Sequence, residues 1–291
     1  MPHQRFSPDV AQLRDAVARI EGDRFGASRR RRSHDVALVS LGNGTLPLDA
    51  ALAGGLRRGA LHEVVAPEAS DAAAAAGFAL SVAGRCAGQA PLVWIVEDHA
   101  ASETGAPYRP GLAAHGIDHD RLILVRTGDA KATLWALEEA LRLGAPAVLA
   151  ELWGAKHYGL APSRRLLLAA QSGRGTAILL HAGLSGGGAA LSSAAETRFA
   201  VAACPSPRLS SAGSRMPIPG PAAVAVRLLK LRLGGGGDVD RERSYPIVWN
   251  PDRKCFDAHP LPVGVHAAVA DRSAPARRSI AGRAIGQASA G

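Results

Sequence analysis

The amino-acid sequence predicts an α/β protein in which a mostly parallel sheet is covered by helices on both faces. From about residue 36, apolar runs of strand length alternate with helical segments. Near-continuous apolar strands are typical of parallel sheets that are buried on both faces. After residue 221 the alternation ends, and two strand-like segments follow that are joined by a "GGGG" turn at 234–237. These two segments predict antiparallel strands added to the same sheet.

The elements follow from hydrophobic periodicity and from the turn residues between them. The predicted strands are 36–41, 61–66, 91–97, 122–127, 147–152, 176–181 and 199–204. The predicted helices are 71–87, 106–115, 130–143 and 162–172, and the C-terminal strand-like segments are 222–233 and 245–250. We divide the chain into an N-terminal helix with a basic linker (1–35), a core domain (36–262) and a basic tail (263–291). The tail is rich in Ala, Arg, Ser and Gly, which predicts disorder.

A short amphipathic helix is predicted over residues 9–20. Val10, Leu13, Val17 and Ile20 recur at helical spacing on one face. The charged, glycine-containing segment 21–35 separates this helix from the core, so the apolar stripe needs another surface to cover it. Two alternatives are open: the helix folds back on its own domain, or it docks on a partner.

Composition limits the class of protein. The formal net charge is +9, and "RRRR" at 29–32 and the arginines of the tail carry much of the excess, which suits a polyanionic partner or solvated segments. The three cysteines are far apart and form no C-x-x-C pair, which argues against a disulfide framework or a zinc site. No apolar stretch is long enough to span a membrane and the N-terminus lacks a signal-like apolar region, so we expect a cytoplasmic protein.

The segment "APEASDAA" (66–73) follows a predicted strand and opens a predicted helix, which is the frame of a phosphate-binding loop. A functional loop reads G-x-x-x-x-G-K-[ST], so that backbone N–H groups and a lysine hold the phosphates while a hydroxyl holds Mg²⁺. Here Ala66 and Asp71 replace the two glycines, Ala72 replaces the lysine, and Ala73 replaces the Ser/Thr. The alternative is an ordinary helix start that is capped by Ser70 or Asp71.

Taken in order, several segments resemble the core of the RecA recombinase family. The segment 48–70 resembles the approach to its phosphate loop, "WIVEDHA" (94–100) its catalytic-glutamate strand, 108–130 the helix and strand that follow, 144–152 its second nucleotide motif, and 175–181 its sensor strand. The resemblance puts Asp98 on the catalytic position, Glu151 on the Mg²⁺-side carboxylate, and His181 where the family has Gln. It implies a RecA-like P-loop NTPase core whose phosphate loop is degenerate, with no catalytic residues and no bound cofactor.

More specifically, the chain resembles the ImuA family, RecA-like proteins of bacterial damage-inducible mutagenesis cassettes that are sometimes described as SulA-like. The short N-terminal helix, the degraded loop and the segment 226–250 carry this resemblance. It implies a scaffold for SOS-induced translesion DNA synthesis in DNA-damage repair. Its expected partners are an ImuB-like protein, which is an inactive Y-family polymerase relative, and an error-prone replicative-type polymerase. Self-association and DNA binding are possible further interactions.

Two other functions stay open at this point. The first is an ATPase with a rewired loop, in which Asp98 or Glu151 serves as the base. The second is a SulA-like inhibitor that caps the cell-division polymer. Glu97 could join the two carboxylates in a cluster at the carboxyl ends of neighbouring strands, where sites of α/β proteins usually lie.

Few cations occupy the segments that correspond to the DNA-binding loops of a recombinase. Arg198 is the cation of the second loop region, and Lys156, Arg164 and Arg165 follow the second nucleotide motif. These four are the candidate DNA contacts, although the two adjacent arginines equally suit a solvated first helical turn.

The segment "HGIDH" (115–119) places two histidines four residues apart, with aspartates beside them. This spacing suits a metal ion only on a continuous helix. Because the glycine at 116 indicates a turn, we expect no metal site there.

Overall fold

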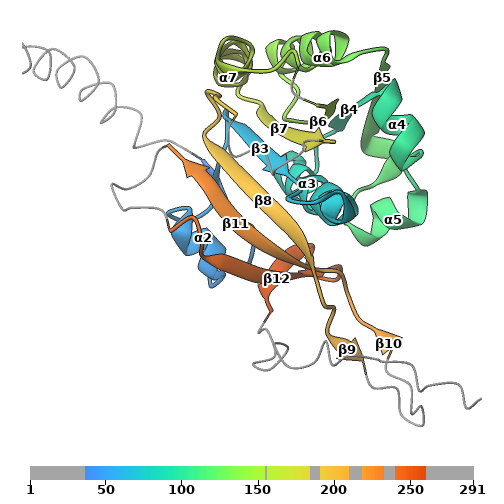
Figure 1. Cartoon of the computed structure of the whole chain (residues 1–291), viewed down its shortest axis with the longest axis vertical. Coiled ribbons are helices and arrows are strands. Elements are labelled where there is room, and N and C mark those ends of the chain that lie inside the picture. The colour runs from blue at the N-terminus through green and yellow to red at the C-terminus, as the bar shows by residue number, and fades with distance from the viewer. Residues whose placement is uncertain (1–36, 155, 184–190, 210–217, 233–239, 260–291) are drawn as a thin grey trace, which may run out of the picture. The chain divides into compact units, whose positions relative to one another are not determined.

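The computed structural model describes residues 37–154, 156–183, 191–209, 218–232 and 240–259, and a nine-stranded mixed sheet runs through them (Figure 1). Its strands are β3 (Leu61–Val65), β4 (Leu92–Glu97), β5 (Leu122–Thr127), β6 (Ala147–Trp153), β7 (Thr176–Ala182), β8 (Thr197–Cys204), β11 (Ala223–Leu231), β12 (Ser244–Asn250) and β13 (Cys255–Ala258). The strand order is β13-β12-β11-β8-β3-β7-β6-β4-β5. Pairing is parallel from β5 to β8 and antiparallel from β8 through β11 and β12 to β13. The predicted α/β class, with its mostly parallel sheet and antiparallel C-terminal strands, is confirmed.

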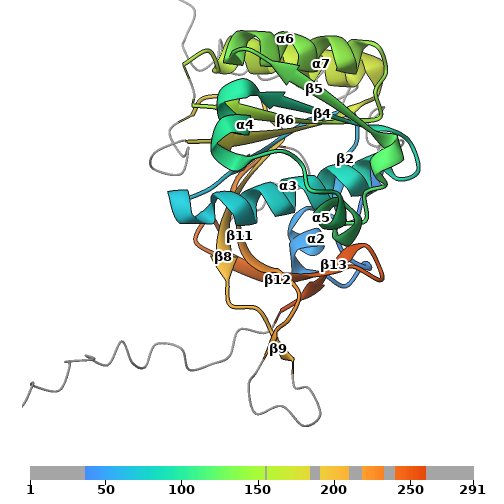
Figure 2. The same cartoon turned by 90° about the vertical axis from the view of Figure 1, so that its right-hand side faces the viewer.

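Helices cover both faces of the parallel strands. The longer ones are α3 (Ala72–Ala87), α6 (Ala130–Arg142) and α7 (Leu160–Gly173), and the shorter ones are α2 (Pro47–Ala51), α4 (Asp98–Thr104) and α5 (Arg109–Ala114). Figure 2 shows α3 on one face and α6 with α7 on the other. Along β7, Ile178 and Leu180 pack toward α3, whereas Ala177 and Leu179 pack toward α6 and α7. This period of two explains why the strand reads as a continuous apolar run.

The sheet curls around α3. The ring of Phe78 in α3 lies 5.5 Å from the ring of Phe199 in β8 and 5.4 Å from the ring of Phe256 in β13, measured between centroids. Two strands separate β8 from β13 in the sheet, so both can contact one helix only if the sheet bends round it (Figure 2). The antiparallel strands therefore close the core on the α3 side.

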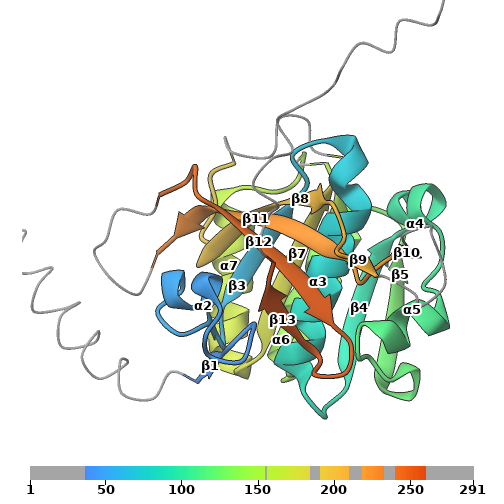
Figure 3. The same cartoon turned by 90° about the horizontal axis from the view of Figure 1, so that it is seen from below.

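The prediction that residues 36–41 form a strand of the main sheet is wrong. Only β1 (Leu38–Val39) is extended there, and it pairs with β2 (Leu56–Arg57) in a separate ribbon near α2 and β13 (Figure 3). The reason is Asp49, whose buried carboxylate accepts the backbone N–H of Leu41 (2.7 Å) and of Gly42 (2.9 Å). Those N–H groups are therefore not available to a sheet ladder.

Other predicted elements differ in extent. The helix expected over 106–115 is α5, which is shorter, and α2, α4 and β13 were not expected. Two 3₁₀ turns, η1 (Ala69–Asp71) and η2 (His119–Arg121), and a two-stranded ribbon of β9 (Arg208–Leu209) with β10 (Ile218–Pro219) complete the elements of the described residues. The predicted helix 9–20 and the tail lie outside these residues. Within the described part of the chain, none of the helices has the length and hydrophobicity that crossing a bilayer requires.

Replacement of Asp49 by alanine should lower the free energy of unfolding by about 2–4 kcal/mol, because it leaves two backbone donors without their charged acceptor. Urea denaturation followed by circular dichroism measures this. The matched control is Asp252→Ala, at an exposed turn position, which should change stability by less than about 0.5 kcal/mol. Equal effects of the two substitutions would contradict the role given to Asp49.

Candidate functional site

A cavity of about 790 Å³ lies at the carboxyl ends of β3, β4, β6 and β7, where open α/β sheets usually bind their ligands. The segment 66–70 and the first turns of α3 form one wall, and the segment 105–107 between α4 and α5 forms another. The cavity brings together these residues from the predicted nucleotide site: Ala66, Ser70, Ala72, Ala73, Glu151 and His181. Segments that are up to 115 positions apart thus meet at one edge of the sheet.

The side chain of Asp71 has neither of the two predicted roles, in a phosphate-binding loop or as a helix cap. It precedes α3 in a helical backbone conformation, and no side-chain hydrogen bond caps the first turn of that helix. Capping by Ser70 or Asp71 is therefore wrong. The Asp71 carboxylate instead accepts the backbone N–H of Ala203 in β8, at 2.8 Å. This bond ties the start of α3 to the end of a neighbouring strand.

Asp98, predicted at the catalytic position, does not line the cavity. Its side chain is about half exposed, and its Oδ1 accepts hydrogen bonds from Nε (2.9 Å) and Nη2 (2.7 Å) of Arg126. Glu97 is buried and accepts the backbone N–H of Trp153 at 3.0 Å. The two carboxylates therefore have separate structural partners and do not form the expected cluster with Glu151.

Glu151 is the buried acid of the cavity wall. Its side chain is 4% exposed, and its Oε1 accepts a hydrogen bond from the indole Nε1 of Trp94 at 3.0 Å. Burial raises the pKa of this carboxyl, and the bond from Trp94 partly opposes the rise. Trp94 lies on β4, which is the direct neighbour of β6. The indole thus holds the carboxylate in place.

The cavity is acidic and apolar. Its carboxylates are Glu68, Glu103 and Glu151, and none of the described residues that line it is a lysine or arginine. A nucleoside triphosphate needs cations and backbone N–H groups around its phosphates. The lining supplies the opposite charge.

A buried polar cluster that the sequence analysis missed joins β3 to β8. Glu63 and Arg198 are direct register partners on β3 and β8, and Glu63 Oε2 accepts a hydrogen bond from Arg198 Nε at 2.6 Å. The hydroxyl of Tyr158 donates to the other Glu63 oxygen, and Arg198 Nη2 donates to Ser193 Oγ at 3.0 Å. Arg198 is 3% exposed, so its prediction as a DNA contact is wrong. The available signal was a charged residue within each of two apolar strands, Glu63 in one and Arg198 in the other.

His181 contacts the same cluster, its ring lying 4.8 Å from the ring of Tyr158. It is 1% exposed, and neither ring nitrogen has a hydrogen-bond partner among the described residues. Burial lowers the pKa of His181 to about 4, although the nearby Glu63 carboxylate favours the charged form. The imidazole is therefore neutral at pH 7.

The other predicted DNA contacts lie on the surface. Lys156 and Arg164 are exposed, and Arg165 is exposed while it pairs with the buried carboxylate of Glu138. The stripe predicted for partner binding lies outside the described residues; it consists of Val10, Leu13, Val17 and Ile20.

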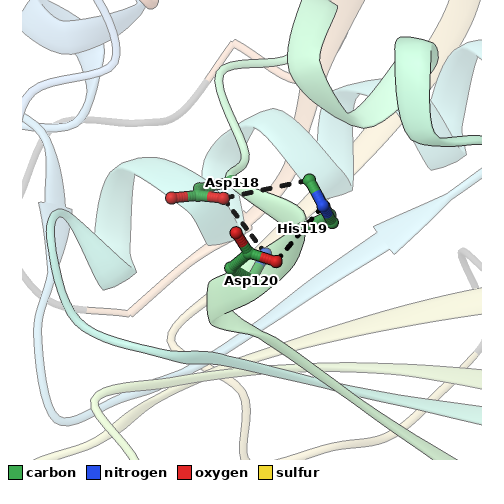
Figure 4. A group of neighbouring side chains, drawn as sticks. All are labelled: Asp118, His119 and Asp120. Atoms are coloured by element: carbon green, nitrogen blue, oxygen red, sulfur yellow. Dashed lines mark hydrogen bonds and ion pairs between the residues drawn. The ribbon is translucent and has the colours of Figure 1, made fainter.

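The histidines at 115 and 119 do not share a helix. His115 follows α5, and its Nδ1 lies 2.7 Å from Ser81 Oγ. His119 begins η2 and contacts Asp118 and Asp120, as Figure 4 shows. The three neighbours at 118–120 are all exposed, and their ligand atoms lie within 4.8 Å of one another. The contact between His119 Nε2 and Asp120 Oδ1, at 3.2 Å, accounts for this geometry.

No protein-family model matches this chain, and no curated protein matches its sequence.

Replacement of Glu63 by glutamine should lower the free energy of unfolding by about 3–5 kcal/mol, because Arg198 is left as a buried charge without its counter-ion. Replacement of both residues by leucine should recover most of this loss, since neither member of the pair then remains as a buried charge. Chemical denaturation of the single and double variants tests both statements. A double variant as unstable as Glu63→Gln would contradict this account.

Stability should fall as the pH drops from about 6.5 to about 4. Burial lowers the pKa of His62 and of His181 to about 4, whereas histidines of the unfolded chain titrate near 6.5. The unfolded chain therefore binds protons first, and acid favours it. His181→Leu should flatten this pH dependence and raise stability at pH 7 by about 1 kcal/mol, because it removes a buried polar ring without partners. His157→Leu, at an exposed position, is the control that should change neither.

Proposed function

We propose that the chain is a non-catalytic RecA-like scaffold for SOS-induced translesion DNA synthesis. In this proposal it binds an ImuB-like inactive polymerase relative and supports an error-prone replicative-type polymerase. The order of the segments that resemble the RecA and ImuA families supports the proposal, as does the mixed sheet with helices on both faces. The observation that carries it is the charge of the cavity beside the degenerate loop.

In this cavity, the groups that a nucleotide requires are replaced or engaged elsewhere. Ala72 and Ala73 stand in place of the lysine and the hydroxyl, and Glu151 would repel phosphate oxygens unless a metal ion lay between them. Asp98, one of the two candidate bases of the rewired-ATPase alternative, is bound to Arg126 and does not line the cavity. Glu151, the other candidate, lines the cavity and accepts a hydrogen bond from the Trp94 indole. The arrangement thus favours a function that depends on surfaces.

Calorimetry with Mg-ATP tests this proposal on the full-length protein, alone and with single-stranded DNA or the ImuB-like partner. We expect no heat of binding in any mixture, because Ala72 and Ala73 replace the lysine and the hydroxyl that would hold the phosphates and Mg²⁺. ATP binding by the protein alone would support the rewired-ATPase alternative. A signal only with the partner would mean that the partner supplies the missing cation, and it would overturn the non-catalytic part of the proposal.

A pull-down separates the scaffold from the cell-division inhibitor. We expect the chain to retain the ImuB-like protein and not the subunit of the cell-division polymer. Leu13→Asp combined with Val17→Asp should abolish this capture, since it places charges on the predicted apolar stripe, and it should leave the circular dichroism of the core unchanged. Capture of the cell-division subunit alone would contradict the proposal.

A further inference from the structure

We propose that the cavity at the carboxyl ends of β3, β4, β6 and β7 receives an arginine side chain, with apolar neighbours, from a partner polypeptide. The inference deepens the proposed function and rests on its conclusion that the cavity no longer holds a nucleotide. It identifies the chemistry that a partner needs in order to dock at this position.

Charge complementarity is the first argument. The chain carries a formal net charge of +9, yet this cavity is lined by Glu68, Glu103 and Glu151, with no lysine or arginine among the described lining residues. Clefts of one sign concentrate ligands of the other. An acidic cavity in a basic protein therefore selects a cationic group.

The state of Glu151 is the second argument. Its side chain is 4% exposed, and among the described residues Trp94 is the one donor to its carboxylate, through Oε1. A carboxylate can accept about four hydrogen bonds. A buried carboxylate with so few donors is costly unless a further donor arrives, and a cationic donor gives the strongest bond.

The walls fit the rest of an arginine side chain and its neighbours. The wall formed by Ala72, Ala73 and Ala76, with Leu180 opposite, is apolar and suits a methylene stem or a flanking apolar residue. The hydrogen bond to Glu151 fixes the indole of Trp94. A guanidinium group can stack on the face of an indole through a cation–π interaction. The volume of about 790 Å³ admits residues on either side of the arginine.

A metal ion is a poorer match for these carboxylates. Among the described residues, one group has ligand atoms close enough together for a metal ion, and it is the exposed turn at 118–120. None of these three residues lines this cavity. Glu68 and Glu103 lie on the exposed rim, while Glu151 lies within the wall. One buried and two exposed carboxylates suit a long cationic side chain that enters from the solvent.

The test uses the full-length protein and two fluorescent peptides, acetyl-Ala-Leu-Arg-Leu-Ala-amide and the same peptide with citrulline in place of arginine. Citrulline keeps the shape and removes the charge. At low salt, anisotropy titrations should show the arginine peptide binding about 10- to 100-fold more tightly, which is the range for a charge-assisted hydrogen bond.

Glu151→Gln keeps an acceptor for Trp94 and removes the charge, so it should abolish most of the preference for arginine. Glu139→Gln is the matched control, because it makes the same change on α6 outside the cavity. If Glu151→Gln fails to fold, Glu103→Gln at the exposed rim should still reduce the preference by several-fold. Equal titration curves for the two peptides, including no binding of either up to about 10 mM, overturn the proposal. Such a result leaves the ATP calorimetry, and hence the proposed function, unaffected.

Discussion

The buried ion pair between Glu63 and Arg198 joins the two kinds of strand pairing in this sheet. It fixes the register of β3 against β8, and β8 is the strand that pairs in parallel on one side and antiparallel on the other. The curl around α3, and with it the position of Phe78, depends on this junction. A one-residue slip of β8 would move Arg198 to the opposite face of the sheet and separate it from Glu63, which breaks a buried ion pair at high cost.

The cavity depends on the same junction through Asp71. Its bond to Ala203 ties the start of α3 to the end of β8, so the loop at 66–70 is held between two strands whose register the ion pair sets. On the other side, Trp94 and Glu151 join β4 to β6. Two polar contacts thus position the loop and the acidic wall at the cavity.

Much of the fold could be predicted from the sequence, because the parallel strands are buried on both faces and read as apolar runs. The prediction of a strand over 36–41 was wrong because backbone N–H groups at the end of this segment bond to the side chain of Asp49. Asp49 lies in α2, a helix that the sequence did not predict. Of the predicted nucleotide-site residues, Asp71 and Asp98 do not line the cavity, whereas the others do. The partners of Asp71, Glu151 and Arg198 could not be predicted, since each lies on a strand that is distant in sequence and adjacent only through the strand order.

The bond between Asp71 and Ala203 has a consequence for any attempt to build a phosphate loop into this chain. A glycine at position 71, which such a loop would require, would remove the carboxylate and with it the tie between α3 and β8. Single changes toward a phosphate loop would therefore weaken the fold before any phosphate binding was gained.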